Sequence, residues 1–301
     1  MELSNKTAVA LGSFDGLHKG HMSVIACALS FRERGLVPLV MLFDSHPLLA
    51  LTGKAPAKIL QDSLRDEIIR SHGLESTVIS FDEIKNYTCR EFFEKIILSR
   101  LNAGAVCCGE NYRFGKNNEG GCDELKALCS EYGVELKISH TVENQGIPVS
   151  STRIRQAIEG GDIPLANSLL GREFRYKQLV VSGDKRGRLI GAPTINQHFD
   201  PDFVIPKIGV YASVTLLGGK EYPSVTNIGL RPSFANEDLR SETCILHFSG
   251  DLYGQEIEVH LLEYLRGEIK FGSMEALGNQ IRTDAARSEE LFSSRGENGN
   301  V

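Results

Sequence analysis

The chain has 301 residues, about twice the usual size of a single domain, so its length favours two folding units. With 41% hydrophobic and 24% charged residues, the composition excludes a disordered or low-complexity chain and supplies enough apolar side chains for sizeable cores. The net charge of −6 argues against a nucleic-acid partner, which needs a basic face, whereas a few local cations suffice for small anionic ligands.

Membrane and export signals are missing from the sequence. No apolar run approaches the roughly 18 residues that span a bilayer, and residues 1–12 lack a basic leader and a cleavage site. We therefore expect a cytoplasmic protein with no membrane partner. The seven cysteines include no CxxC pair and no zinc-like spacing, so we expect reduced, structural thiols.

The first half alternates apolar runs typical of strands with helix-like segments. This alternation predicts an α/β fold, a Rossmann-like parallel sheet with ligands beyond the carboxyl ends of its strands. Asp62 is a plausible N-cap, and Gly73 and Gly133 are plausible helix stops. The predicted strands are 7–11, 37–43, 77–81 and 105–108, and the predicted helices are 22–34, 63–72, 90–101 and 123–132.

After residue 175 the pattern changes to short strands separated by glycine-rich turns. Such spacing predicts an antiparallel β-barrel, closed by one helix over 274–292 and followed by a polar tail, 293–301. The domains are thus expected at 1–172 and 173–292, with a boundary near 171–176. The predicted strands are 179–182, 210–217, 223–228, 243–248 and 256–262.

Residues 12–21 (GSFDGLHKGH) connect the first predicted strand to the first helix. Glycines let the backbone approach a ligand closely, and a helix N-terminus offers free N–H groups to phosphate. His18 and His21 could both donate to phosphate oxygens during transfer at phosphorus. The alternative is an ordinary turn with capping or surface histidines, and a metal site would need a third ligand that the sequence does not nominate. The phosphate-binding candidates here are Gly12, Phe14, Asp15, Gly16 and Gly20.

A second phosphate-binding candidate lies at residues 150–155 (SSTRIR). Ser150, Ser151 and Thr152 precede a short predicted helix, 154–159, and can cap it while offering hydroxyl groups to a triphosphate. Arg153 and Arg155 add positive charge in a shape that matches phosphate. On its own, the segment could equally be a capped helix with two surface arginines.

Residues 183–196 combine glycines and cations with a Thr-x-Asn pair. Glycine-rich backbone with Lys and Arg suits nucleotide phosphates, and the oxygens of Thr194 and Asn196 suit Mg²⁺. A basic hairpin followed by a polar turn is the alternative. The phosphate-binding candidates are Gly183, Lys185, Arg186, Gly187, Arg188 and Gly191.

The HxGH stretch at residues 18–21 resembles that of the HxGH nucleotidyltransferase superfamily. Together with FDSHP at 43–47, GENYRFG at 109–115 and SSTRIR at 150–155, it looks like the FAD synthetase module of bacterial bifunctional riboflavin kinase/FAD synthetases. His46, held extended before Pro47 at a strand end, and Asn111 are also placed to meet a ligand. The resemblance implies a flavin-binding set of His46, Pro47, Asn111, Tyr112, Arg113 and Phe114, with Arg231 and Arg266 in the second half.

The second half resembles the riboflavin kinase module of the same family through five motifs. The resemblance implies Mg²⁺ at Thr194 and Asn196, ATP as co-substrate, and Glu242 as the catalytic base. Taken singly, Glu242 could be a solvated strand residue. The motifs are GVY at 209–211, NIGLRPSF at 227–234, SET at 241–243, DLYG at 251–254 and LRGEIKF at 265–271.

The implied function is a bifunctional enzyme that phosphorylates riboflavin with MgATP and then adenylylates FMN, giving FAD and pyrophosphate. One alternative is a monofunctional FAD synthetase whose barrel only holds flavin, and another is a non-catalytic flavin-binding regulator. Five positions depart from the family pattern, and two of these, Ala192 and Ile195, flank the implied metal ligands. The departures are Asn118, Gln178, Ser182, Ala192 and Ile195.

Overall fold

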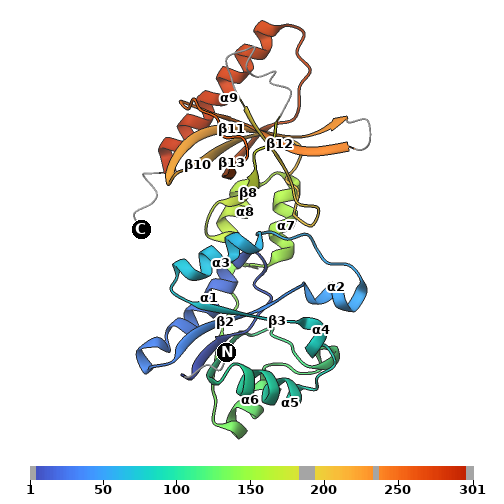
Figure 1. The fold of residues 1–301 in the computed structure, drawn as a ribbon, viewed down its shortest axis with the longest axis vertical. Coiled ribbons are helices and arrows are strands. Elements are labelled where there is room, and N and C mark those ends of the chain that lie inside the picture. The colour runs from blue at the N-terminus through green and yellow to red at the C-terminus, as the bar shows by residue number, and fades with distance from the viewer. Residues whose placement is uncertain (1–4, 183–193, 233–236, 296–301) are drawn as a thin grey trace. The chain divides into compact units, whose positions relative to one another are not determined.

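A computed structural model describes residues 5–182, 194–232 and 237–295 of the chain (Figure 1). The chain forms two compact units: Met1–Lys58 with Asp62–Ser151, and Ile59–Gln61 with Thr152–Val301. All but the first residue of helix α7 (Ser151–Gly160), and the whole of α8 (Ile163–Leu170), thus belong to the second unit. These units are defined by compactness. The expected boundary at 172/173 divides the chain by catalytic module instead, and it stays a prediction.

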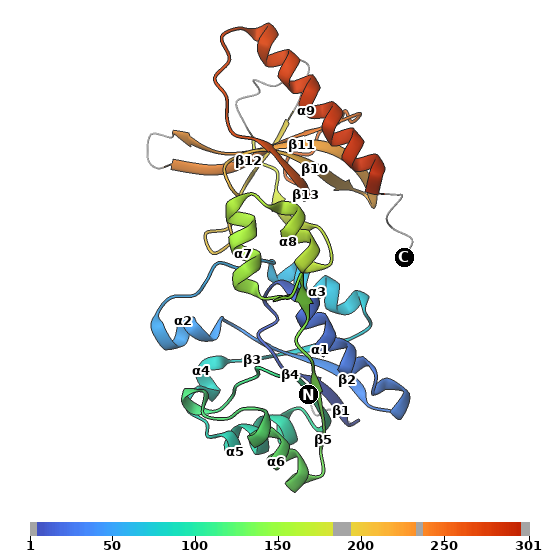
Figure 2. The ribbon, with the colours of Figure 1, turned by 180° about the vertical axis from the view of Figure 1, so that it is seen from behind.

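Five parallel strands form the sheet of the first unit, in the spatial order β3-β2-β1-β4-β5 (Figure 2). The central strands are almost continuously apolar and buried, as a parallel sheet covered on both faces requires. The predicted Rossmann-like α/β fold is confirmed. The strands are β1 (Thr7–Ala10), β2 (Val37–Phe43), β3 (Glu75–Ile79), β4 (Ala103–Gly109) and β5 (Glu135–Ser139), and β6 (Glu143–Asn144) and β7 (Ile147–Pro148) form a separate hairpin.

The helices of this unit follow local sequence signals closely. Gly73 and Gly133 adopt φ angles of 73° and 67° after α3 and α6, which confirms both predicted stops. Asp62 is the first residue of α3 rather than its cap. The predicted helix 90–101 begins as α5 and continues as a π-helical stretch, Phe93–Arg100. The helices are α1 (Lys19–Leu29), α2 (Pro47–Thr52), α3 (Asp62–Ser71), α4 (Phe81–Ile84), α5 (Cys89–Phe92) and α6 (Cys122–Tyr132).

The strand order reverses direction at the centre of this sheet. The chain passes from β1 through β2 to β3 on one side and then returns to place β4 and β5 on the other side of β1. In open α/β sheets, such a reversal opens a crevice at the carboxyl ends of the two strands involved. Gly12 follows β1 closely and Glu110 follows β4 directly, so both residues lie at this crevice.

The second unit is built on a six-stranded antiparallel sheet, in the order β8-β13-β10-β11-β12-β9, with α9 packed on β10 and β11. The sheet curls so that its two edge strands approach each other. Gln197 Nε2 on edge strand β9 donates to Gln178 O on the other edge strand at 2.7 Å. The predicted antiparallel barrel with a closing helix is thus confirmed as a curled half-barrel. The elements are β8 (Phe174–Leu179), β9 (Thr194–His198), β10 (Gly209–Leu217), β11 (Lys220–Pro232), β12 (Glu237–Ile245), β13 (Glu256–Arg266) and α9 (Met274–Arg295).

Three predictions for this unit are wrong in detail. The strand expected at 179–182 is β8, a few residues earlier, where Phe174 and Tyr176 are buried at alternate positions. The strand expected to reach residue 248 ends at Ile245, and His247 takes a left-handed φ of 58°. The closing helix expected to end at residue 292 continues to Arg295, which donates to Glu173.

The two faces of the curled sheet differ in chemistry. One face carries a ladder of buried hydroxyl groups, in which Thr226 lies 2.8 Å from Ser213 and 2.9 Å from Thr243, measured between side-chain oxygens. Because successive side chains of a strand alternate between faces, the neighbours Asn227 and Glu242 belong to the other face. That second face is where the predicted catalytic residues of this unit lie.

Candidate functional site

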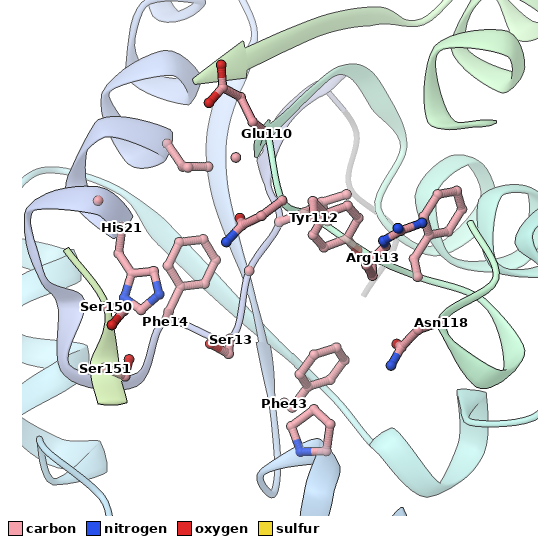
Figure 3. Close-up of a pocket in the computed structure, with 18 of the residues that line it drawn as sticks. Ser13, Phe14, His21, Phe43, Glu110, Tyr112, Arg113, Asn118, Ser150 and Ser151 are labelled. Carbon is pink, nitrogen blue, oxygen red and sulfur yellow. The ribbon is translucent and has the colours of Figure 1, made fainter. Parts of the chain in front are cut away.

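A pocket of about 480 Å³ occupies the crevice at the carboxyl ends of β1 and β4. Gly12 lines it after β1, and Gly109, the last residue of β4, lines it together with Glu110. Figure 3 shows His21, Ser150 and Ser151 on one side of the pocket, facing Tyr112, Arg113 and Asn118 on the other. The switch-point argument therefore predicts the position of the cavity correctly.

A strained turn leads from β1 into this pocket. Phe14, Gly16 and Leu17 adopt left-handed φ angles of 50°, 78° and 42°. Only glycine takes such angles at little cost, so Phe14 and Leu17 store backbone strain, which burial of both side chains offsets. Ser151 Oγ donates to Asp15 O at 3.1 Å and fixes the turn against the start of α7.

The two histidines of this segment form a stacked pair. His18 is the N-cap of α1, where its Nδ1 accepts from the backbone N–H of His21 at 3.2 Å. The imidazole rings lie 3.7 Å apart at an angle of 14°, and both residues line the pocket. Because Nδ1 of His18 accepts a hydrogen bond, the ring proton of His18 belongs on Nε2. The structure thus brings together the two predicted catalytic histidines in one cavity.

The phosphate-binding candidates of the first unit divide into two groups. Those that line the pocket are Gly12, Phe14, Gly20, Ser150 and Ser151. Asp15 and Gly16 shape the turn beneath it, and Thr152, Arg153 and Arg155 continue α7 in the second unit. For both groups, phosphate binding stays a prediction.

The loop after β4 supplies the opposite wall. The rings of Tyr112 and Phe114 stack, with centroids 5.8 Å apart. Glu110 accepts from His140 Nδ1 at 2.7 Å and from the backbone N–H of Thr141 at 3.0 Å. These hydrogen bonds, led by that from His140, lower the pKa of the Glu110 carboxyl. The predicted flavin-binding residues that line the pocket are Pro47, Asn111, Tyr112, Arg113 and Phe114.

His46 lies differently from its neighbours in the motif. Its Nδ1 accepts from the backbone N–H of Leu48 at 3.2 Å, so the imidazole is the N-cap of α2 and is not among the residues that line the pocket. A flavin contact by His46 stays a prediction.

Sequence reasoning missed an apolar wall of the same pocket. Phe43 and Phe81 meet edge-to-face with centroids 5.4 Å apart at the carboxyl end of β2, and Leu48 and Leu51 are exposed beside them. Apolar residues next to strands look like ordinary core in a sequence. The available signal was the position of Phe43 as the first residue of the FDSHP motif.

In the second unit, Asn196 and Glu242 lie directly opposite each other on strands β9 and β12. Asn196 is only 5% exposed, and its Oδ1 is buried without a hydrogen-bond partner among the described residues. Thr194 lies two residues earlier on β9 and therefore on the same face. A buried oxygen that lacks a donor, beside a threonine hydroxyl and a carboxylate, fits the hard oxygen ligands that Mg²⁺ prefers.

The remaining candidates of the second unit are less well placed or lie outside the described residues. Arg266 Nη2 donates to Asp284 Oδ2 on α9 at 2.7 Å, so this guanidinium is occupied by an ion pair. Arg231 lies on β11, and its role stays a prediction. Outside the described residues are Gly183, Lys185, Arg186, Gly187, Arg188, Gly191 and Ala192.

The described residues hold neither a metal-ligand cluster of His, Cys, Asp or Glu nor a membrane-spanning helix. Residues 5–182, 194–232 and 237–295 contain no group of three or more His, Cys, Asp or Glu that could hold a metal ion. Across the same ranges, none of the helices combines the length and the apolar character needed to cross a bilayer.

Known proteins resemble this chain over nearly its whole length. A family model of FAD synthetase matches residues 1–153, and a family model of riboflavin kinase matches 170–292. A bifunctional riboflavin kinase/FMN adenylyltransferase from Escherichia coli K12 is 36% identical over 94% of this chain and 92% of its own. The protein of the same description from Bacillus subtilis is 34% identical, over 96% and 93%.

A solved structure has a similar fold over nearly the whole chain. A crystal structure described as a macrolide-efflux protein from Streptococcus pneumoniae superposes with a TM-score of 0.88 at 31% identity, covering 95% of each chain. The two family models together span most of the chain, and the matched motifs carry the pocket and the strand residues described above. The chain therefore belongs to the family of bifunctional riboflavin kinase/FMN adenylyltransferases.

Proposed function

We propose that the protein makes FAD from riboflavin in two transfers from ATP. In the first, the ribityl 5′-oxygen bonds to the γ-phosphorus of ATP, the bond from that phosphorus to the β-phosphate oxygen breaks, and ADP leaves with FMN formed. In the second, a phosphate oxygen of FMN attacks the α-phosphorus of another ATP, and pyrophosphate leaves with FAD formed. The first transfer belongs to the second unit, and the other transfer to the first unit.

The stacked imidazole pair is the observation that carries the FAD synthetase assignment. Two ring N–H donors at a helix N-terminus, inside a pocket at the strand-switch point, suit the charge that develops on phosphate oxygens. The backbone N–H of His21 occupies His18 Nδ1, so the Nε2–H of His18, on the other side of the ring, is the donor for a phosphate oxygen. Since FMN brings its own nucleophilic phosphate, direct in-line attack needs no covalent enzyme intermediate.

Glu242 is the base that we propose for the kinase reaction. A carboxylate needs only to accept the hydroxyl proton as the γ-phosphoryl group arrives, because phosphoryl transfer depends mainly on positioning and charge neutralisation. Asn196 lies opposite Glu242, so the metal-bound triphosphate and the base would meet at one point of the sheet. Thr194 and Asn196 would hold Mg²⁺, which neutralises phosphate charge when bound. We further propose that the protein is located in the cytoplasm and that its partners are small molecules.

Two substitutions in the full-length chain test the assignment of two separate sites. His21→Ala should lower FAD formation at least 100-fold and leave FMN formation within about twofold, because one imidazole donor is lost from one pocket only. Glu242→Ala should strongly lower FMN formation from riboflavin and leave FAD formation from supplied FMN intact. The measurement is a chromatographic time course of riboflavin, FMN and FAD with MgATP.

The same time course separates the rival functions. A monofunctional FAD synthetase, suggested by Ala192 and Ile195 beside the metal ligands, would convert FMN to FAD but leave riboflavin unchanged. A flavin-binding regulator would show no turnover of either substrate. Equal loss of both activities in His21→Ala would contradict the assignment of separate sites.

A further inference from the structure

Three polar residues lie in register across three neighbouring strands of the second unit. Glu242 on β12 pairs with Asn196 on β9 at one side and with Asn227 on β11 at the other. Directly opposite residues of antiparallel strands project from the same face, with Cβ atoms about 4.5–5.5 Å apart. Glu242 is therefore flanked by two carboxamides, and we call Asn196, Glu242 and Asn227 the polar row.

The oxygen atoms of both carboxamides point to a ligand. Asn196 Oδ1 and Asn227 Oδ1 are buried, and neither has a hydrogen-bond partner among the residues that the structure describes. Buried polar atoms in native proteins are nearly always satisfied, so an unsatisfied pair on either side of a carboxylate marks positions that bound groups complete. The Asn196 oxygen suits a cation, and the Asn227 oxygen needs a donor.

The surroundings of Asn227 fix which of its ends is available. A methyl group on Gly229, two residues along β11, would lie 3.5 Å from Asn227 Nδ2 and 2.5 Å from Glu268 Oε1. The amide nitrogen of Asn227 is therefore the end directed toward Gly229. Asn227 Oδ1 is left as a hydrogen-bond acceptor beside Glu242.

The geometry of phosphoryl transfer then distinguishes the two sides of Glu242. In an in-line displacement, the attacking hydroxyl and the departing ADP lie on opposite sides of the γ-phosphorus. With the triphosphate on the Asn196 side, the acceptor alcohol approaches from the Asn227 side. We propose that Asn227 binds the hydroxyl-bearing chain of the acceptor through Oδ1 and so selects a polyhydroxyl acceptor and orients it toward Glu242. This inference rests on the proposed kinase function of the second unit.

The test compares the ribityl chain with the flavin ring in the full-length protein. Lumiflavin has the ring without the ribityl chain, and its binding is to be measured as competitive inhibition of riboflavin phosphorylation. In Asn227→Ala, the KM for riboflavin should rise about tenfold, as expected for a lost hydrogen bond to a substrate. The Ki of lumiflavin and the KM for MgATP should stay within about twofold, which a general distortion of the site would not allow.

Two further variants guard the interpretation. Val225→Ala truncates the preceding same-face residue of β11, opposite Cys244, and should leave all three constants unchanged. Asn227→Leu removes the carboxamide but keeps more of the side-chain volume than alanine does. It should give the same rise in the KM for riboflavin, so the test remains available if Asn227→Ala does not fold.

The possible failures are distinguishable. An unchanged KM for riboflavin in a folded Asn227 variant, or an equal rise in the Ki of lumiflavin, overturns the acceptor role. A selective rise in the KM for MgATP would assign Asn227 to the triphosphate side and also overturn it. If the unaltered protein makes no FMN at all, the proposed kinase function fails instead.

Discussion

Gly20 couples backbone conformation to the position of a proposed catalytic ring. It lies in the first turn of α1, where a methyl group would be 3.1 Å from Cε1 of His18. That distance is shorter than ordinary van der Waals contact, so His18 would have to move. The HxGH spacing therefore has a steric reason beyond helix capping.

Replacing Gly20 with alanine should separate stability from activity. Alanine favours the helix by up to about 1 kcal/mol, which offsets the local crowding, so the Tm should change by less than about 3 °C. FAD formation should fall about 10–100-fold, because a small displacement of a phosphate donor is costly. Gly160→Ala is the matched control, since its methyl group meets nothing within 4 Å. Full activity of Gly20→Ala would contradict the proposed position of His18.

At the same scale, sequence reasoning succeeds where residues are close in the chain. His18 and His21 are three residues apart at a helix start, so their meeting follows from helix geometry alone. Arg266 and Asp284 meet only because α9 folds back onto the sheet, and no local pattern announces this ion pair. The flavin contact that the family resemblance implies for Arg266 stays a prediction beside this ion pair.

Among the elements, the end of α9 is fixed by a buried charge network. His260 on β13 has Nδ1 at 2.9 Å from Glu173 Oε2 and Nε2 at 2.7 Å from Glu258 Oε1. Both ring nitrogens face carboxylates, so both must donate and the imidazole is protonated. Arg295, the last residue of α9, donates to Glu173 at 2.8 Å and thereby joins the helix to the network.

The pKa shifts in this network predict a pH dependence for the second unit. Burial alone would lower the pKa of His260, but hydrogen bonds to Glu173 and Glu258 outweigh it and raise the pKa above the ordinary 6.5. The stabilisation is therefore complete below about pH 6.5 and is lost as the pH rises through the raised value. The pKa values of Glu173 and Glu258 are lowered despite burial, so their contribution is lost only in acid.

The Tm measured between pH 5.5 and 9 should fall as His260 loses its proton. For a unit of this size, each kcal/mol of lost stability lowers the Tm by about 2–4 °C. His260→Gln should lower the Tm at pH 6 and flatten the profile. His247→Gln is the control, because its pair with Glu289 is 72% exposed on the histidine side and contributes little. A profile that is unchanged in His260→Gln would exclude the imidazolium as its source.

At the scale of elements, strands were predicted correctly where their residues are apolar throughout and less well where polar residues interrupt them. Residues 37–43 read correctly as β2, because a strand buried on both faces is apolar throughout. β8 was misplaced, since Arg175 and Lys177 alternate with its buried aromatic residues. No strand was predicted over β9, in which Thr194, Asn196 and Gln197 are polar although the latter two are buried. Polar side chains on a buried strand hide the apolar alternation by which a strand is recognised in a sequence.

For the whole molecule, the cysteines were expected to be reduced and structural, and all seven are free thiols. Burial raises the pKa of the Cys107 thiol to about 12 and that of Cys129 to about 11. Desolvation is likewise the main cause of the raised pKa values of Cys89, Cys108 and Cys244. Since the thiolate is the reactive form, these five positions should be inert near neutral pH in both units.

Labelling with a thiol reagent at pH 7.5 should therefore modify only the half-buried Cys27 and Cys122 quickly, and all seven thiols after denaturation. Peptide mass mapping identifies the modified positions, and Cys27→Ser with Cys122→Ser should abolish the fast phase. Cys122 Sγ donates to Glu110 O at 3.3 Å, beside the pocket, so its modification should slow FAD formation more than FMN formation. Fast labelling of Cys107 or Cys129 would mean that a core opens readily in solution, and the compact units would then be less rigid than their packing indicates.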